Sequence, residues 1–93
     1  MGNGKFLFGQ VVATPGALEL LDRTGKKAEA FLARHLSGDW GDVPTGDKAL
    51  NDAALIPGKE DRLMSSYMVG DVKVWIITEW DRSVTTLLLP SEY

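Results

Sequence analysis

The chain contains no cysteine, which excludes a disulfide framework, a thiolate nucleophile and any zinc site built on cysteine. Histidine is nearly absent as well, because His35 is the only one among 93 residues. A zinc centre usually takes two or three His or Cys ligands, so a single histidine is too few. We therefore expect neither a bound metal nor a cofactor.

The sequence also lacks long apolar runs and the common catalytic signatures. No run approaches the ~20 residues of a membrane-spanning helix, and the opening MGNGKFLFGQ does not contain the apolar core of a signal peptide. The patterns GxxxxGK(S/T), GxSxG and HExxH do not occur. We expect a cytoplasmic protein that does not contact a membrane, without P-loop, α/β-hydrolase or zincin chemistry.

Positive charge is scarce. Ten Lys and Arg stand against 13 Asp and Glu, which gives a net charge of −3. The only close basic cluster is Lys26–Lys27, with Arg23 and Arg34 nearby. Proteins that bind nucleic acid gain much of their affinity from basic groups that neutralise phosphates. This balance disfavours nucleic acid as a ligand and favours a protein partner.

What remains is the composition of an ordinary folded domain. Hydrophobic residues make up 44% of the chain and charged residues 25%, a balance that disfavours disorder. A chain of 93 residues corresponds to one domain. We therefore predict a single domain over residues 1–93, with a flexible N-terminus at residues 1–7.

A strand signal and then a helix signal open the chain. FGQVVA, residues 8–13, is typical of a short strand because it is rich in β-branched residues. Thr14-Pro15 supplies the N-cap and first residue of a helix, and Gly25 is a suitable end for it. The residues predicted to be buried on this helix are Ala17, Leu18 and Leu21.

A second helix is predicted within residues 26–38, because apolar positions recur there at intervals of three and four before Gly38. His35 lies in its last turn, on or beside the buried face. A third, shorter helix is predicted over residues 47–56, ended by Pro57-Gly58. The buried positions of the second helix are Ala28, Phe31, Leu32, His35 and Leu36.

The C-terminal third predicts three antiparallel strands, over residues 62–69, 72–80 and 83–90. Gly70-Asp71 is typical of a two-residue hairpin turn, and Asp81-Arg82 marks a second tight turn. The first turn sets the register of the first two strands. It pairs Val69 with Val72, Tyr67 with Val74, Ser65 with Ile76, and Leu63 with Thr78.

Together these elements predict an α+β fold. A short N-terminal strand is followed by two to three helices and then by a C-terminal three-stranded antiparallel β-meander packed on the helices. Both faces of the meander carry apolar side chains, so we expect both faces to be partly covered.

The segment RHLSGDWGDV, residues 34–43, holds the first candidate site. His35 has an ordinary pKa near neutrality, and the negative end of the helix dipole favours its protonated form. It can act as a general acid or base, or it can be a half-buried histidine bonded to a carbonyl or to Asp39. Trp40 can belong to a contact surface, or it can fill the gap between helix and sheet. We favour the architectural interpretation of both.

Polar residues gather around the second turn, within WIITEWDRSVTTLLLP at residues 75–90. Thr78 faces Thr85 in the predicted register, and Glu79 lies across from Arg62. A row of hydroxyls on a sheet can bind an extended ligand or can belong to a solvated surface. Glu79 and Arg62 can be a catalytic pair, or a surface ion pair worth under ~1 kcal/mol.

The runs FLARHLSGDWGDV and WIITEWDRSVTTLLLPSEY resemble a family of small bacterial proteins that are often encoded on plasmids or other mobile elements. The similarity spans residues 9–93 and rests on the DWGD motif at 39–42 and on the TE…DR…TT…LP…Y pattern at 78–93. The resemblance implies a mobile-element setting and no particular mechanism. Trp80 departs from the family pattern, which is expected to have a small residue there, and an aromatic side chain at this position extends a contact surface.

We predict a non-enzymatic binding or accessory module whose contact surface lies on the C-terminal hairpin. The alternative is a metal-independent ribonuclease, by fold analogy with barnase-, colicin- and EndoU-type enzymes, although the acidic charge counts against it. In that alternative His35 or Glu79 is the base, Arg82 steadies the phosphate, and Thr85 and Tyr67 assist. The predicted contact residues are Asp39, Trp40, Thr78, Trp80, Arg82 and Thr85.

Overall fold

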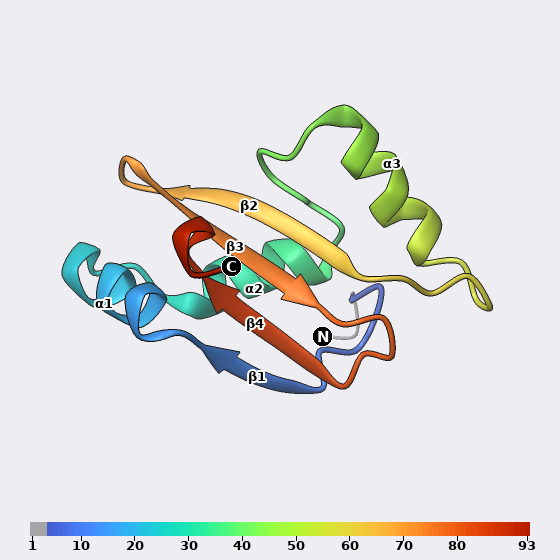
Figure 1. Cartoon of the computed structure of the whole chain (residues 1–93), viewed down its shortest axis with the longest axis horizontal. Helices are drawn as coiled ribbons and strands as arrows, with labels where there is room; N and C mark the ends of the chain where they lie inside the picture. The colour runs from blue at the N-terminus through green and yellow to red at the C-terminus, as the bar shows by residue number, and fades with distance from the viewer. Residues whose placement is uncertain (1–3) are drawn as a thin grey trace.

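The computed structural model describes residues 4–93, and they form an α+β fold in which three helices accompany one four-stranded sheet (Figure 1). The N-terminal half holds β1 (Gln10–Ala13), α1 (Pro15–Thr24), α2 (Ala28–Leu36) and α3 (Thr45–Ala54). The C-terminal part holds β2 (Leu63–Val69), β3 (Val72–Thr78), β4 (Val84–Leu88) and the 3₁₀ turn η1 (Pro90–Glu92).

The predicted β-meander and its register are confirmed. All four predicted pairs of β2 with β3 are present, from Leu63–Thr78 at one end to Val69–Val72 at the other, and Thr78 pairs with Thr85. The sheet order is β1-β4-β3-β2, because β1 joins the meander as a fourth strand, parallel to β4. The pattern predicts β1 as a strand but not its neighbour, since parallel pairing joins segments that lie far apart in the chain.

The two turns of the meander differ. At the first, Gly70 has φ of 67° and is the only turn residue with a positive φ, as a type II′ turn requires. The second is a four-residue loop, because the N–H of Glu79 donates to the carbonyl of Val84. The predicted tight turn is present, because the N–H of Arg82 donates to the carbonyl of Glu79, but the loop is two residues longer than Asp81-Arg82 alone. The pairing of β3 with β4 is nevertheless as predicted, because both loop lengths give the same register.

Helix α1 begins and ends where the sequence predicts. Thr14 Oγ1 accepts a hydrogen bond from the N–H of Ala17, and Gly25 follows the helix with φ of 70°. The buried face is rotated from the predicted one, because Leu20 is buried whereas Leu18 is 56% exposed. Leu18 lies one position, or about 100°, around the helix from Ala17. The buried residues of α1 are Ala17, Leu20 and Leu21.

Helix α2 presents the face predicted for it. His35 is buried, and Gly38 follows the helix with φ of 88°. Helix α3 spans Thr45–Ala54 and so begins and ends two residues before the predicted 47–56. The earlier start follows from Pro44, which has extended backbone and immediately precedes the helix.

Residues 4–7, expected to be flexible, lie against α2 in this structure, whereas residues 1–3 are outside the described part. The N–H of Lys5 donates to the carbonyl of Leu36 at the end of α2, over 2.9 Å. The ring of Phe6 packs on nearby aromatic side chains. This segment therefore closes one side of the core.

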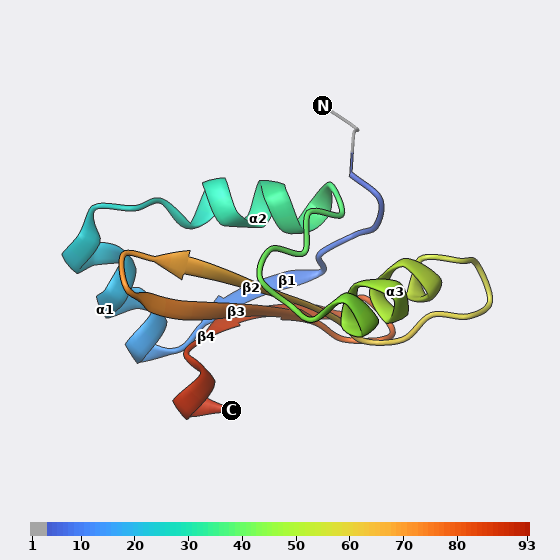
Figure 2. The ribbon, with the colours of Figure 1, turned by 90° about the horizontal axis from the view of Figure 1, so that it is seen from above.

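The helices cover the two faces of the sheet unequally. Figure 2 shows α1 and α2 over one face, α3 beside the β2 edge, and η1 at the opposite face. The main core lies between the first face and α1 and α2. A smaller core joins the loop after α2 to α3 and β2. Its buried members are Trp40, Val43, Ala54 and Leu63.

Candidate functional site

The predicted site residue His35 lies in a row of buried hydrogen bonds that crosses the sheet. Helix α2 places its imidazole over the face that carries Ser65 and Thr78. Nδ1 lies 2.5 Å from Ser65 Oγ, and Nε2 lies 3.0 Å from Thr78 Oγ1. Thr78 Oγ1 is 2.7 Å from Thr85 Oγ1, which donates to the carbonyl of Phe8 over 2.8 Å. We call His35, Ser65, Thr78 and Thr85 the buried polar row, since each is 0% exposed.

For a neutral His35, only one direction of proton donation satisfies the whole row. The carbonyl of Phe8 can only accept, so Thr85 donates to it and accepts from Thr78. Thr78 then accepts from the Nε2–H of His35, which leaves Nδ1 to accept from the Ser65 hydroxyl. A neutral His35 is therefore the Nε2–H tautomer, and both of its ring nitrogens are occupied.

The surroundings of His35 favour this neutral form. Burial, and secondarily the positive charge of Arg82, lowers the pKa of His35 from 6.5 to about 4. The rings of Phe6, Phe8 and Trp40 surround the imidazole at centroid distances of 5.2, 6.3 and 5.6 Å. The helix dipole favours the protonated form of His35, but the loss of hydration outweighs the dipole at a fully buried ring.

Asp39, one of the two alternative partners named for a structural His35, does not bond to it. The Asp39 carboxylate accepts instead from Arg34 Nε over 2.7 Å and from the N–H of Gly41 over 3.3 Å. The hydrogen bond from Arg34 is the main reason that the pKa of the Asp39 carboxyl lies below its ordinary value. Asp39 is exposed, so its carboxylate remains accessible from solvent.

Trp40 fills the space between α3 and the sheet, as the architectural interpretation predicts. It is 3% exposed, and its Nε1 donates to the carboxylate of Asp52 over 2.9 Å. The chain around it pairs with the edge of β2, because Ser66 donates to the Trp40 carbonyl and accepts from the N–H of Asp42. Gly41 has φ of 74°, and a Cβ there would collide with the Ser66 carbonyl.

Arg82 is a backbone clamp in the loop between β3 and β4. Its Nη1 donates to the carbonyls of Asp61, Glu79 and Trp80, over 2.7, 3.1 and 3.2 Å. Its Nη2 donates over 2.8 Å to the carbonyl of Ala54 at the end of α3. The guanidinium thus joins three segments of backbone, and these donors point to carbonyls rather than to a site for phosphate.

Among the described residues, Glu79 and Arg62 do not form the predicted ion pair. Arg62 Nη1 donates to the hydroxyl of Tyr93 over 2.7 Å, and the guanidinium lies 5.5 Å from the centre of that ring. The ring of Tyr93 in turn meets Trp75 edge-on. Arg62 therefore contacts Tyr93 instead of Glu79, which is the partner that the predicted register gives it.

Trp80 is the predicted contact residue that the structure leaves most plainly at the surface, with 61% of its area exposed. Trp80 is the first residue of the loop over residues 80–83. Within this loop the Asp81 carboxylate accepts from the N–H and the hydroxyl of Ser83, over 3.1 and 2.6 Å. Arg82 fastens the same loop to α3. The indole therefore projects from a loop whose backbone is held on both sides.

The six predicted contact residues divide into two groups. Three are buried in this structure and therefore lie away from the surface predicted for them, because they serve the buried polar row or the small core. The others are reachable from solvent, and their contact with a partner stays a prediction. The buried residues are Trp40, Thr78 and Thr85, and the others are Asp39, Trp80 and the partly exposed Arg82.

The residues that the ribonuclease alternative requires do not line a common cavity. His35 and Thr85 are enclosed in the buried polar row. Glu79 follows the end of β3, and Arg82 lies in the loop between β3 and β4. Tyr67 donates its hydroxyl to the carbonyl of Asp39, and burial raises the pKa of Tyr67 to about 12. These residues therefore share no accessible surface in this conformation.

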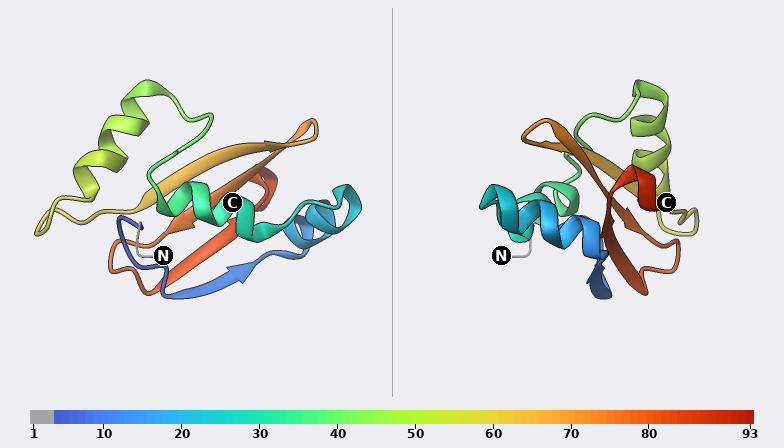
Figure 3. Two further views of the ribbon diagram at one scale, coloured as in Figure 1. Left: turned by 180° about the vertical axis from the view of Figure 1, so that it is seen from behind. Right: turned by 60° about the vertical axis from the view of Figure 1, so that its left-hand side comes forward.

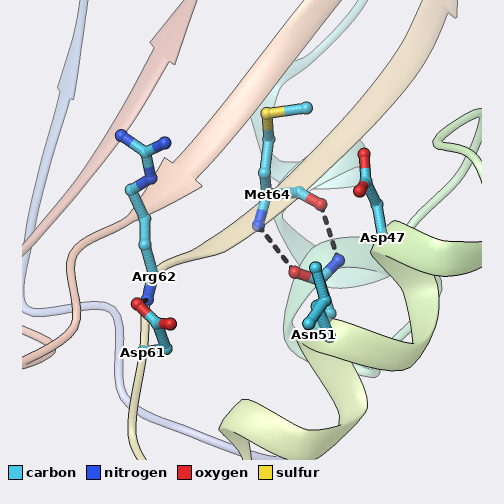
Figure 4. Close-up of a pocket in the computed structure, with 6 residues that line it drawn as sticks. Asp47, Asn51, Asp61, Arg62 and Met64 are labelled. Atoms are coloured by element: carbon cyan, nitrogen blue, oxygen red, sulfur yellow. Dashed lines mark hydrogen bonds between the residues drawn. The ribbon is translucent and has the colours of Figure 1, made fainter.

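Two surface cavities flank the β2 edge. Figure 4 shows the first, of about 240 Å³, between α3 and the start of β2. The second, of about 330 Å³, lies at the other end of β2 beside Arg34 and Met68. His35 lines neither of them. The residues of the first are Asp47, Leu50, Asn51, Asp61, Arg62 and Met64.

Sequence reasoning missed two residues that organise this region. Ser65 was assigned a strand partner but no role, although an inward-facing serine beside a helix histidine is a recognisable signal for a buried hydrogen bond. Asn51 is buried, and its carboxamide bonds to both backbone groups of Met64, over 2.8 and 3.1 Å. An asparagine in a helix interior is unfavourable without such a partner, which is the signal that was available.

Comparisons with known proteins do not identify the chain. No protein-family model, curated protein or solved structure matches it. Over residues 4–93, the helices are too short or too polar to cross a membrane. The same residues place no three His, Cys, Asp or Glu side chains together as metal ligands.

Proposed function

We propose that the chain is a small cytoplasmic binding module of bacterial mobile-element origin, without catalytic activity, that contacts a protein partner through the loop carrying Trp80. The exposed indole of Trp80 on a clamped loop is the observation that carries this proposal. The resemblance to plasmid-related proteins supports the setting of the proposal and not its mechanism.

A large aromatic side chain on an ordered loop is well suited to binding. Tryptophan is enriched among the residues that contribute most to protein–protein affinity. Binding costs less entropy when the contacting segment is already ordered in the free protein. Arg82 and Asp81 provide that order through their bonds to Ala54 and Ser83. Trp80 can therefore enter a pocket of the partner without further ordering of its backbone.

The surroundings of Trp80 indicate the character of the partner. Ile56 is 48% exposed just beyond α3, and Figure 1 shows that this segment and the loop of Trp80 lie at the same end of the molecule. Exposed carboxylates of Glu60 and Asp81 accompany them, each within the electrostatic influence of Arg82. An apolar pocket with a basic rim complements this surface.

A crosslinking experiment tests the proposal. A photoreactive amino acid is placed at position 80, and in a matched control at the exposed Leu18 on α1, at the far end of the molecule. We expect one protein to crosslink from position 80 only. With that protein purified, Trp80→Ala should weaken binding by about 10-fold or more, as for a central interface tryptophan. Leu18→Ala should leave the affinity within about twofold.

Two results would contradict the proposal. One is crosslinking of the same proteins with equal yield from both positions. The other is an unchanged affinity for the Trp80→Ala variant, because the partner would then contact another surface.

The ribonuclease alternative makes a different prediction, at His35. RNA cleavage by the purified chain that His35→Gln abolishes, with the fold retained, would replace the binding proposal. The burial of His35 and the occupation of both ring nitrogens support the binding module instead.

A further inference from the structure

The two edge strands of the sheet differ in how far the chain covers them. At β2, the backbone groups of Met64 bond to the carboxamide of Asn51. Those of Ser66 bond to the carbonyl of Trp40 and to the N–H of Asp42. The chain therefore covers much of this edge with its own atoms, which is one way that proteins prevent edge strands of different molecules from pairing.

At β1, residues 4–93 leave the outward backbone N–H and C=O groups uncovered. The N–H of Gln10 donates to the carbonyl of Ser83, the residue before β4, and the N–H of Thr14 donates to the carbonyl of Leu87, each over 2.9 Å. These bonds belong to the parallel ladder of β1 and β4. Alternate residues of such a ladder bond to the neighbouring strand, so Val11 and Ala13 direct their N–H and C=O groups outward. Among residues 4–93 these groups have no bonding partner beyond β1, and no element lies there in Figure 3.

Strand β1 also lacks the side chains that keep edge strands apart. Val11 and Val12 are 43% and 37% exposed, and residues 6–18 contain no charged side chain. Lysine, proline within the strand and bulges are common protections. Gln10–Ala13 contains neither lysine nor proline, and its pairing with β4 is continuous. A length of four residues is the protection that remains.

We infer that β1 is a self-association edge, on which two copies of the chain pair their β1 strands antiparallel about a two-fold axis at Val12. Val11 of each copy lies opposite Ala13 of the other and exchanges both outward hydrogen bonds with it, and the two Val12 residues face each other at the axis. The two four-stranded sheets thereby become one continuous sheet.

A second copy suits this edge because the edge is its own complement. Its outward groups lie on Val11 and Ala13, placed symmetrically about Val12, as a two-fold contact requires. The neutral stretch at 6–18 lets two molecules of net charge −3 meet without like charges at the axis. Two strands of this length bury less than the ~800 Å² per partner of a standard interface. The dimer is therefore weak, and it forms independently of Trp80.

Sedimentation velocity tests this inference on the full chain. From micromolar to millimolar concentration, the mass should rise from 10.2 kDa toward twice that value. Val11→Lys places one charge on each side of the axis and should keep the chain monomeric, whereas Leu18→Lys on exposed α1 should still associate. A chain that stays monomeric at millimolar concentration overturns the inference. So does association that Val11→Lys does not weaken.

A cysteine variant gives a second test that does not rely on a charged residue being tolerated. The chain has no cysteine, so any disulfide in a single-cysteine variant joins two molecules. In the proposed register the two Val12 Cα atoms lie about 4.5 Å apart, within disulfide range, whereas the two Val11 Cα atoms lie beyond it. Val12→Cys should therefore form a disulfide dimer at least several-fold faster than Val11→Cys on oxidation. Equal rates overturn the inference.

Discussion

Trp40 and Trp80 have similar local sequences and opposite environments. Each is flanked by acidic residues, in GDWGD and in TEWDR, yet Trp40 is 3% exposed and Trp80 is 61% exposed. The difference lies in how the backbone beside each indole is attached. The chain at Trp40 pairs with Ser66 on β2, which directs the indole onto α3. Arg82 fastens the chain at Trp80 to the end of α3 by carbonyl bonds alone, which leaves the indole outside.

The largest expected effect in this comparison is that of Trp40→Ala. The substitution removes a buried indole and leaves a cavity beside Asp52, whose carboxylate loses its donor. We expect the free energy of unfolding to fall by about 3–5 kcal/mol, as for other buried tryptophans. Urea denaturation followed by circular dichroism measures it. A loss below about 1 kcal/mol would contradict the assignment of Trp40 to the small core.

The acid sensitivity of the fold gives the next largest effect. The unfolded chain takes up a proton on His35 near pH 6.5, whereas the folded chain does so only at about 4. Between these values the unfolded state binds more protons, so the free energy of unfolding decreases as the pH falls. The contribution is fully present above about pH 6.5, and about 3 kcal/mol of it is lost by about pH 4.

A histidine-free variant separates this effect from those of the carboxyl groups. Hydrogen bonds keep the pKa values of Asp39, Asp81 and Glu92 below their ordinary values, so those groups lower the stability mainly below about pH 4. Denaturation of His35→Gln should therefore show a much flatter dependence on pH between 4 and 6.5. An equal slope in both proteins would show that His35 does not carry the effect.

Much of the fold follows from local signals that act within a few residues. The cap at Thr14, the stop at Gly25 and the hairpin at Gly70 each depend on backbone preferences of their own residues, and all three appear where predicted. The partner of β1 could not be predicted in the same way. Its ladder joins β1 to β4 through backbone groups, which are the same in every residue type and so leave no pattern in the sequence.

The candidate site was predicted as a set of residues but not as an arrangement. Thr78, Thr85 and His35 are identifiable as polar residues inside apolar elements, and the register correctly pairs the two threonines. A polar strand residue can face solvent or a buried partner, and side-chain type does not distinguish the two. The packing of α2 decides it here, by placing His35 between Ser65 and Thr78.

Arg82→Lys tests the attachment that keeps Trp80 outside. A lysine retains the charge but lacks the planar fork that reaches the carbonyls of Asp61 and Ala54 together. We expect a loss of about 2 kcal/mol in the free energy of unfolding, because bonds from a charged donor are worth about 1.5–3 kcal/mol each and some survive. Amide hydrogen exchange should accelerate in residues 79–83. Unchanged exchange there would show that the loop is held by other contacts.

The smallest expected effect is that of Trp80→Ala on stability. An indole with 61% of its surface in solvent loses little on truncation, so the free energy of unfolding should change by less than about 0.5 kcal/mol. The same denaturation series that measures Trp40→Ala measures this value. A loss comparable to that of Trp40 would show that Trp80 packs into the fold in solution, and it would remove the indole from the contact surface. A near-zero loss of stability together with a large loss of partner affinity would assign the two tryptophans to separate tasks, because the side chain would then contribute to binding and not to folding.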